Sequence, residues 1–284
     1  MQTTSKHTFY RFLTAALLLL VMCMVCVQPV DAKKKKSKYD LKREHPSYLP
    51  LIEPDPITRK AAPDNHPKAL QKPDLAGIGH GAVGNPLHGI DVSHYQGRIN
   101  WQEVARDSQV GYVYMKMTEG SNMVDNTYEY NNREARRAGL KVGVYHFFRA
   151  NTTAEAQFAN FMSVFKKQNQ DLIPIVDVEL SNGVSDGVFV SRLEKLLELI
   201  TKEIGKKPMI YTGKHYYKKY CAYNSKLRSY PYMIASYTFT PPTLERGDEY
   251  MMWQFTSQGT VRGIKGDVDR SKFMGRHTIH EIMF

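Results

Sequence analysis

Eight short apolar runs punctuate the chain between residues 88 and 273, and longer amphipathic stretches separate most of them. The runs are residues 88–92, 112–118, 142–148, 173–179, 208–212, 232–237, 251–256 and 267–273. Short apolar runs of this length are typical of buried strands, and their alternation with amphipathic segments is typical of βα units in a parallel sheet. Eight strands are the number that closes a (β/α) barrel. We therefore predict an α/β fold.

Three amphipathic stretches predict helices, at about residues 127–138, 153–168 and 187–204. In the third stretch a stop signal, Gly205, follows apolar residues that recur with helical spacing: Val190, Leu193, Leu197, Ile200 and Ile204. After residue 237 the intervals between the runs are too short for full helices. The expected architecture is an irregular TIM-like (β/α) barrel with reduced helices in the last third.

The fourth apolar run ends with two carboxylates, Asp177 and Glu179. Side chains two positions apart on a strand share a face, with Cα atoms roughly 6 to 7 Å apart. At the C-terminal end of a barrel strand that face is where active sites lie. The pKa values of two neighbouring carboxyls are pushed apart, so one can donate a proton while the other stays charged, which suits acid-catalysed hydrolysis. The alternative is that this D-x-E merely caps the next helix or solvates a loop.

Further acids and aromatic residues lie in or at the ends of the other runs. Asp91 is in the first run, and Asp267 and Asp269 are in the last. Closing a barrel puts the first strand beside the last, so these acids would face Glu179 across one mouth. Strand alternation leaves open which of Asp267 and Asp269 points inward. The aromatic and imidazole side chains are Tyr145, His146, Phe148, Tyr211, Tyr237 and Trp253.

Flat aromatic faces beside carboxylates suit sugar rings, whose C–H faces pack on aromatic rings while their hydroxyls bond the acids. Taken singly, each aromatic residue could equally be core packing. For His146 we favour a buried imidazole with satisfied hydrogen bonds.

Residues 1–32 have the features of a secretory signal. Lys6 and Arg11 form the basic region, residues 13–27 the apolar core, and residues 30–32 a small-residue cleavage site. The apolar run is shorter than the roughly 20 residues of a membrane-spanning helix, which favours cleavage over an uncleaved membrane anchor. We expect a secreted, periplasmic or cell-envelope protein, membrane-anchored if the signal is retained.

Residues 33–86 begin with four lysines and contain many prolines, which predicts an extended linker or arm before a catalytic domain at residues 87–284. The alternative is an ordered arm that wraps the surface of the domain. Loss of residues 1–32 lowers the net charge from +11 to +10. Such a charge attracts polyanions. We expect an anionic wall polymer or a membrane surface as the partner of the arm. We exclude nucleic acid, because no helix-turn-helix, zinc or aromatic RNA-binding signature accompanies the charge.

Cysteine usage limits the chemistry further. Cys23 and Cys26 lie in the signal segment, so Cys221 is alone in the mature chain and cannot form an intramolecular disulfide. It lies in a helical segment rich in tyrosine and lysine with no His/Asp cluster nearby. We interpret it as a packing residue and not as a nucleophile.

Seven ordered blocks resemble one family, the family 25 glycoside hydrolases, which are lysozyme-like muramidases. They are GIDVSHYQG (89–97), KMTEG (116–120), AGLKVGVYHFF (138–148), PIVDVE (174–179), IYT (210–212), WQFT (253–256) and DVDRS (267–271). The resemblance extends over about residues 88–276. It implies a modified (β/α) barrel that cleaves the β-1,4 bond between N-acetylmuramic acid and N-acetylglucosamine in the glycan strands of peptidoglycan.

The resemblance also implies roles for individual residues. Glu179 matches the general acid, and Asp177 the carboxylate that assists the N-acetyl group of the sugar or acts as nucleophile. Asp91 and Asp269 match the acids of the first and last blocks. The positions that match a glycan groove are Glu119, Tyr145, Tyr211 and Trp253, to which the strand-end reasoning adds Phe148 and Tyr237.

We expect a monomeric enzyme that needs no cofactor or metal. Without the resemblance, a metal-dependent hydrolase would be the second enzyme class, because four carboxylates at one mouth could bind Mg²⁺ or Ca²⁺. The competing functions are a non-catalytic glycan-binding module on the same barrel and a cationic wall-binding or structural protein. The presence of all four acids favours the enzyme.

Overall fold

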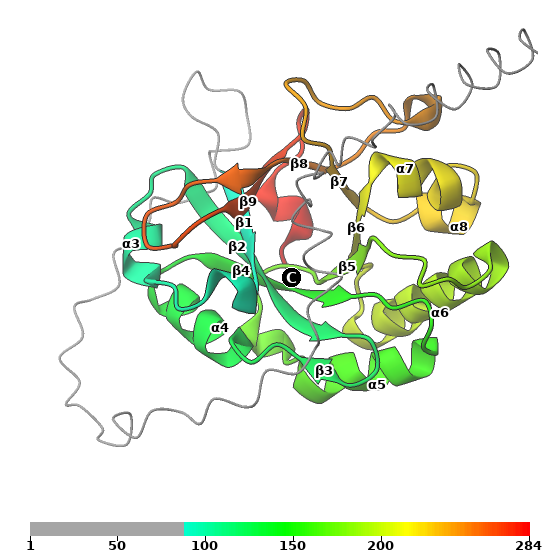
Figure 1. Ribbon diagram of the computed structural model, residues 1–284, viewed down its shortest axis with the longest axis horizontal. Coiled ribbons are helices and arrows are strands. Elements are labelled where there is room, and N and C mark those ends of the chain that lie inside the picture. Colours follow the sequence, from blue (N-terminus) through cyan, green and yellow to red (C-terminus); the bar gives the residue numbers. More distant parts are fainter. Residues whose placement is uncertain (1–87) are drawn as a thin grey trace, which may run out of the picture. The chain divides into compact units, whose positions relative to one another are not determined.

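The computed structural model describes residues 88–284, which form an eight-stranded barrel with helices along part of its outer surface (Figure 1). The barrel strands are β1 (His88–Val92), β2 (Val110–Glu119), β4 (Lys141–Phe147), β5 (Ile175–Val178), β6 (Met209–Gly213), β7 (Tyr232–Ala235), β8 (Met252–Gly259) and β9 (Val268–Phe273). Each coincides with one of the eight apolar runs. The prediction of an irregular TIM-like barrel is confirmed.

The barrel closes because β1 pairs with β2 on one side and with β9 on the other. Around the ring the order is β1, β9, β8, β7, β6, β5, β4 and β2. All neighbouring pairs are parallel except those of β9, which is antiparallel to both β1 and β8. A two-residue strand, β3 (Met123–Val124), extends β2 as a hairpin. Because β8 and β9 are consecutive and antiparallel, the connection between them is a hairpin and needs no helix.

The helices are concentrated in the first two thirds of the barrel. They are α3 (Trp101–Ala105), α4 (Tyr128–Arg137), α5 (Ala154–Val164), α6 (Asp186–Ile204), α7 (Lys214–Tyr216), a π-helical turn η5 (Tyr217–Cys221) and α8 (Ser225–Arg228). Between β7 and β8, and beyond β9, the described residues contain only the short 3₁₀ turns Glu245–Gly247 and Ile279–Ile282. The predicted loss of helices in the last third is confirmed.

The sequence explains where the long helix α6 begins and ends. The side chain of Ser185 caps its first turn by accepting a hydrogen bond from the amide of Val188, and Gly205 ends it in the left-handed conformation with φ of 76°. The predicted stripe is buried at Leu193, Leu197, Ile200 and Ile204, whereas Val190 is only partly buried.

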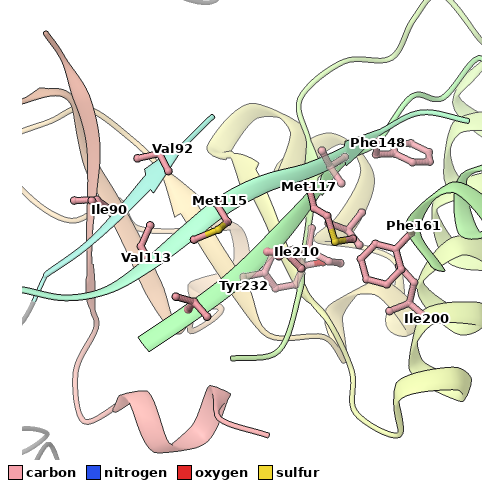
Figure 2. Packing of buried hydrophobic residues seen from close by; sticks show 14 of the residues in the cluster. Ile90, Val92, Val113, Met115, Met117, Phe148, Phe161, Ile200, Ile210 and Tyr232 are labelled. Carbon is pink, nitrogen blue, oxygen red and sulfur yellow. The ribbon is translucent and has the colours of Figure 1, made fainter. Parts of the chain in front are cut away.

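Two hydrophobic layers hold the barrel together. One fills its interior with residues such as Tyr112, Tyr114, Ile175 and Met209. The other lies between the outer faces of the strands and the helices, and Figure 2 shows part of it, including Val113, Met115 and Phe161. Successive residues of β2 alternate between the two layers, as side chains on a strand must. This alternation decides which strand-end residues can reach the mouth.

The predicted signal (residues 1–32) and arm (residues 33–86) lie outside the described residues. Within residues 88–284, no helix is long and apolar enough to cross a membrane. Cys221 is 2 % exposed, and burial raises its pKa to about 11, which suits a packing residue.

Candidate active site

Four carboxylates are carried by strands that lie opposite one another in the barrel. Asp91 of β1 and Asp269 of β9 are directly paired across the antiparallel ladder. Their Cβ atoms are therefore about 4.5–5.5 Å apart on the same face. Asp177 lies in β5 and Glu179 immediately follows that strand on the same face. Between β9 and β5 the ring contains β8, β7 and β6, so the two pairs of acids face each other across the barrel.

All four acids lie close enough to Tyr211 of β6 for their charges to affect its pKa. Burial raises the pKa of its phenol well above the usual value, and the negative charges of Glu179, Asp177, Asp91 and Asp269 raise it further. Tyr145 of β4 shows the same pattern, with burial first and then the charges of Asp177, Asp91, Asp125 and Asp269. Both phenols stay neutral at physiological pH. Tyr145 can therefore donate a hydrogen bond among the carboxylates, whereas the Tyr211 hydroxyl donates its proton to Gln254.

Gln254 of β8 joins the two sides of the site. Its amide nitrogen donates to Asp91 Oδ2 at 2.9 Å. Its oxygen accepts hydrogen bonds from the hydroxyls of Tyr211 and Tyr237, each at 2.8 Å. Because the donor end is fixed by Asp91, the acceptor end is fixed as well. The buried amide thus holds one carboxylate and two phenols in a set arrangement.

The structure shows which of Asp267 and Asp269 points into the barrel, a question that strand alternation cannot decide. Asp269 is buried, paired with Asp91, and its charge acts on Tyr211, Tyr145 and Tyr237. Asp267 is exposed and precedes the first residue of β9. Its carbonyl oxygen accepts a hydrogen bond from the Gln96 side chain at 3.3 Å. Asp269 is therefore the acid at the mouth.

Glu119 lies at the end of β2 in a cluster with two cations. It forms ion pairs with Lys116 and Arg149, and the Arg149 Nε to Glu119 Oε1 distance is 2.7 Å. Burial opposes its ionisation, but the two cations outweigh this effect and hold its pKa below the usual value. Both cations also lie over the ring of Phe147, at 5.1 and 4.8 Å from its centroid. Glu119 thus orders the rim beside Phe147.

The structure does not bring Phe148 and Trp253 to the mouth. Phe148 is 0 % exposed and packs edge-on against Phe189 of α6, in the layer that Figure 2 shows. Trp253 is 3 % exposed, lies next in sequence to the inward Gln254, and packs against Phe255 with Lys272 over its ring. Buried on the outer face of the barrel, neither ring can offer a face to a sugar.

His146 is also on the outer face, as the sequence interpretation favoured. It is 0 % exposed, and its ring nitrogens lie 2.8 Å from the Thr118 hydroxyl and 3.3 Å from the Gln157 side-chain oxygen. Burial lowers its pKa to about 4, so it is neutral at physiological pH. Gln157 also holds the main chain of Arg149, through Arg149 N and Arg149 O.

Two residues of the mouth and one exposed residue in the loop after β7 were missed from the sequence. Gln254 and Phe147 are next in sequence to Trp253 and Phe148, the residues predicted from the sequence. Because side chains alternate between the two faces of a strand, the inward positions are those of Gln254 and Phe147. Phe239 lies two residues after Tyr237 and is fully exposed, whereas Tyr237 is 43 % exposed. The third signal, a phenylalanine in a Thr- and Pro-rich loop, is weak in the sequence alone.

The four acids line the mouth as two pairs on opposite sides. Among the described residues no three His, Cys, Asp or Glu side chains are placed to hold one metal ion. What the arrangement offers is a proton donor or acceptor on β5, negative charge from both sides, and neutral phenols between them. This suits acid catalysis on a bond at which positive charge develops.

Comparison with known proteins agrees with this chemistry. Residues 90–264 match the model of a protein family described as glycosyl hydrolases family 25. That range contains Asp91, Asp177 and Glu179 and ends before Asp269. The match covers more than half of the chain.

Named relatives and a solved structure are similar over the same region. The chain is 34 % identical over 200 residues to the uncharacterized protein YegX of Escherichia coli K12, which covers 69 % of this chain and 72 % of YegX. It is 31 % identical over 201 residues to lysozyme M1 of Streptomyces globisporus, 66 % of this chain and 68 % of that protein. The crystal structure of the bacterial lysozyme from Streptomyces coelicolor superposes with a TM-score of 0.61 at 29 % identity. The match covers 66 % of this chain and 92 % of the lysozyme chain.

Proposed function

The chain belongs to glycosyl hydrolase family 25, and on this premise we propose that it is a peptidoglycan muramidase. It would hydrolyse the β-1,4 bond between N-acetylmuramic acid and N-acetylglucosamine. The observation that carries the proposal is the convergence of Glu179, Asp177, Asp91 and Asp269 around Tyr211. Similarity to lysozyme M1 and to the S. coelicolor lysozyme supports the choice of substrate.

In the proposed mechanism Glu179 is the general acid. It donates its proton to the glycosidic oxygen as the bond to the leaving sugar breaks. Positive charge then develops at the anomeric carbon of the muramic acid. Asp177, two residues away on the same face, stabilises that charge directly or orients the N-acetyl oxygen for internal attack. Water completes the hydrolysis and returns the proton to Glu179.

The opposite wall would hold the sugar and add negative charge. Asp91 and Asp269 face the same centre, and the hydrogen bond from Gln254 keeps Asp91 in place. The Tyr145 phenol lies among Asp177, Asp91 and Asp269 and stays protonated, so it is placed to donate to a sugar substituent. Tyr237, which is 43 % exposed and donates to Gln254, supplies aromatic surface at the rim for pyranose rings.

Replacing Asp269 with Asn tests the second pair of acids. We expect kcat to fall by about 10²-fold, because an electrostatic partner of the transition state is lost. The matched control is Asp267→Asn, since this acid is exposed and lies two residues away. Its kcat should stay within about twofold of the wild type. The measurement is the initial rate of soluble muropeptide release from purified peptidoglycan. Equal losses in the two variants would contradict the assignment of Asp269.

The alternative is a non-catalytic glycan-binding module on the same barrel. Such a module would bind glycan through the aromatic rim and would not cleave it, so it would not need the acids. The presence of all four acids at the mouth favours the enzyme. A wild-type protein that binds peptidoglycan and releases no fragments would favour the module.

We also propose secretion through residues 1–32 and attachment to an anionic wall polymer or membrane surface through residues 33–86. The support is the signal-like composition of the first segment and the lysine run of the second. Deleting residues 33–86 should lower the amount of protein that pellets with peptidoglycan at low salt, where electrostatic attraction is least screened. Unchanged pelleting would reject the role of the arm.

A further inference from the structure

A pocket of about 410 Å³ lies outside the ring of catalytic carboxylates, between α3, α4 and the β8–β9 connection. We call it the α3–α4 pocket. Its lining consists of Arg98, Ile99, Asn100, Trp101, Gln102, Tyr130, Glu134 and Lys265. None of these residues belongs to the site described above.

The pocket lies over the buried Ile99 and Trp101, and its exposed lining is mostly polar and includes the basic residues Arg98 and Lys265. Ile99 and Trp101 are 1 % and 2 % exposed, and the Trp101 indole N–H donates to Asn131 Oδ1 at 3.1 Å. The Arg98 guanidinium lies over the Tyr130 ring, 4.6 Å from its centroid. The Tyr130 hydroxyl donates to the carbonyl of Ile99 at 3.0 Å. Arg98 is therefore presented on a fixed aromatic face, which lowers the entropy lost when it binds a ligand.

The pocket carries uncompensated positive charge. In the part of the chain that the structure describes, neither Arg98 nor Lys265 forms an ion pair with a carboxylate. The one acid in the lining, Glu134, is already paired with Arg133 at 2.8 Å and with Arg137 at 3.2 Å. A ligand with carboxylates therefore matches this lining in charge.

The two basic residues of the pocket, Arg98 and Lys265, lie close in sequence to the acids Asp91 and Asp269. Lys265 precedes Asp269 by four residues, so their Cα atoms are at most about 14 Å apart. Arg98 follows Asp91 by seven residues. The segments around the two basic residues are tied together, because the amide of Asn100 donates to the carbonyl of Gly263 at 2.9 Å. The pocket is thus held at a short distance from the mouth.

We propose that the α3–α4 pocket binds the acidic peptide that muramic acid carries on its lactyl group. The proposal rests on the muramidase function and specifies which part of the substrate is recognised beside the glycan. An extended tetrapeptide spans about 14 Å, which is enough to cover the distance of at most about 14 Å from Asp269 to Lys265. Carboxylates of the peptide pair with Arg98 and Lys265 of the lining. The peptide contributes to substrate binding and takes no part in bond cleavage.

The kinetic test compares glycan with and without its peptides. Peptidoglycan and the same material stripped by an amidase are given to the wild type and to the double variant Arg98→Ala/Lys265→Ala. We expect KM for the peptide-bearing glycan to rise about tenfold in the variant, with kcat unchanged and the stripped glycan unaffected. The matched control is Arg106→Ala/Arg262→Ala, which removes the same charge from exposed residues outside the lining. An equal rise for both glycans, or no rise, would overturn the proposal.

A binding test that needs no turnover separates this proposal from the muramidase function. The indole N–H resonance of Trp101 is followed by NMR while a synthetic tetrapeptide with two free carboxylates is added to the full chain. A saturable shift in the wild type that disappears in Arg98→Ala/Lys265→Ala supports peptide binding even if no glycan is cut. A shift with poly(glycerol phosphate) and none with the peptide would assign the pocket to a wall polymer and overturn the proposal.

Discussion

Replacing Glu179 with Gln is expected to lower kcat for glycan cleavage by about 10²–10⁴-fold, the range for loss of a general acid. The amide has nearly the same shape and cannot donate a proton to the glycosidic oxygen. Glu179 is partly buried and follows the fully buried strand β5, whose other residues are unchanged in the variant. Folding and affinity for peptidoglycan should therefore survive. The measurement is the rate of fragment release beside a pelleting assay.

The matched control is Glu203→Gln, which changes an exposed carboxylate on α6 in the same way. Its kcat should equal that of the wild type. If Glu179→Gln kept more than about a tenth of the wild-type rate, Glu179 would not be the general acid. If the variant lost binding together with turnover, the acid would be needed to hold the glycan instead.

Replacing Gly89 with Ala should destabilise the barrel by about 3 kcal/mol, the upper part of the usual range for overpacking. A Cβ atom at this position would lie only 1.8 Å from a ring atom of Tyr112. Tyr112 is 0 % exposed and fills the barrel interior, with its hydroxyl 3.4 Å from Ser271. Because the Tyr112 ring is buried and cannot swing out to solvent, we expect the strand that carries Asp91 to shift. Urea denaturation followed by circular dichroism measures the change.

The control for Gly89→Ala is a second glycine-to-alanine change at Gly187, in the first turn of α6. A Cβ atom there meets nothing within 4 Å. We expect this variant to be more stable than the wild type by about 0.4–1 kcal/mol, because the unfolded chain loses freedom. A Gly89→Ala variant within about 0.5 kcal/mol of the wild type would show that the Tyr112 ring can move aside.

The strands were predictable because most of them, such as β2, β5 and β6, are buried along nearly their whole length, and buried strands have mostly apolar sequences. The three longer helices were predictable from their apolar spacing. The short helices α3, α7 and α8 and the π-helical turn η5 were not, because segments of three to five residues are too short to display a helical period. Their positions are set by packing against the barrel.

The candidate site was predictable for the acids and less so for the aromatic residues. Asp91, Asp177, Glu179 and Asp269 were named from strand ends and from the family resemblance, and the structure gathers all four around Tyr211. Phe148 could not share a face with Tyr145 on a regular strand, because the two are three positions apart. Parity therefore assigns Phe147, and not Phe148, to the mouth.

The remaining features depend on contacts that no local pattern encodes. Gln254 gains its role from Asp91, which is 163 residues away in the sequence, and from Tyr211, which is 43 residues away. The α3–α4 pocket likewise joins residues 98–102 to Lys265. Contacts of this kind follow from barrel closure, which brings the first strand beside the last.

The most direct test of the account is mass spectrometry of borohydride-reduced products after purified peptidoglycan has been incubated with the wild type and with Glu179→Gln. We predict disaccharide peptides that end in reduced N-acetylmuramic acid, present with the wild type and absent with the variant. Products that end in reduced N-acetylglucosamine would contradict the assigned bond, and an absence of cut glycan with the wild type would contradict the muramidase function itself.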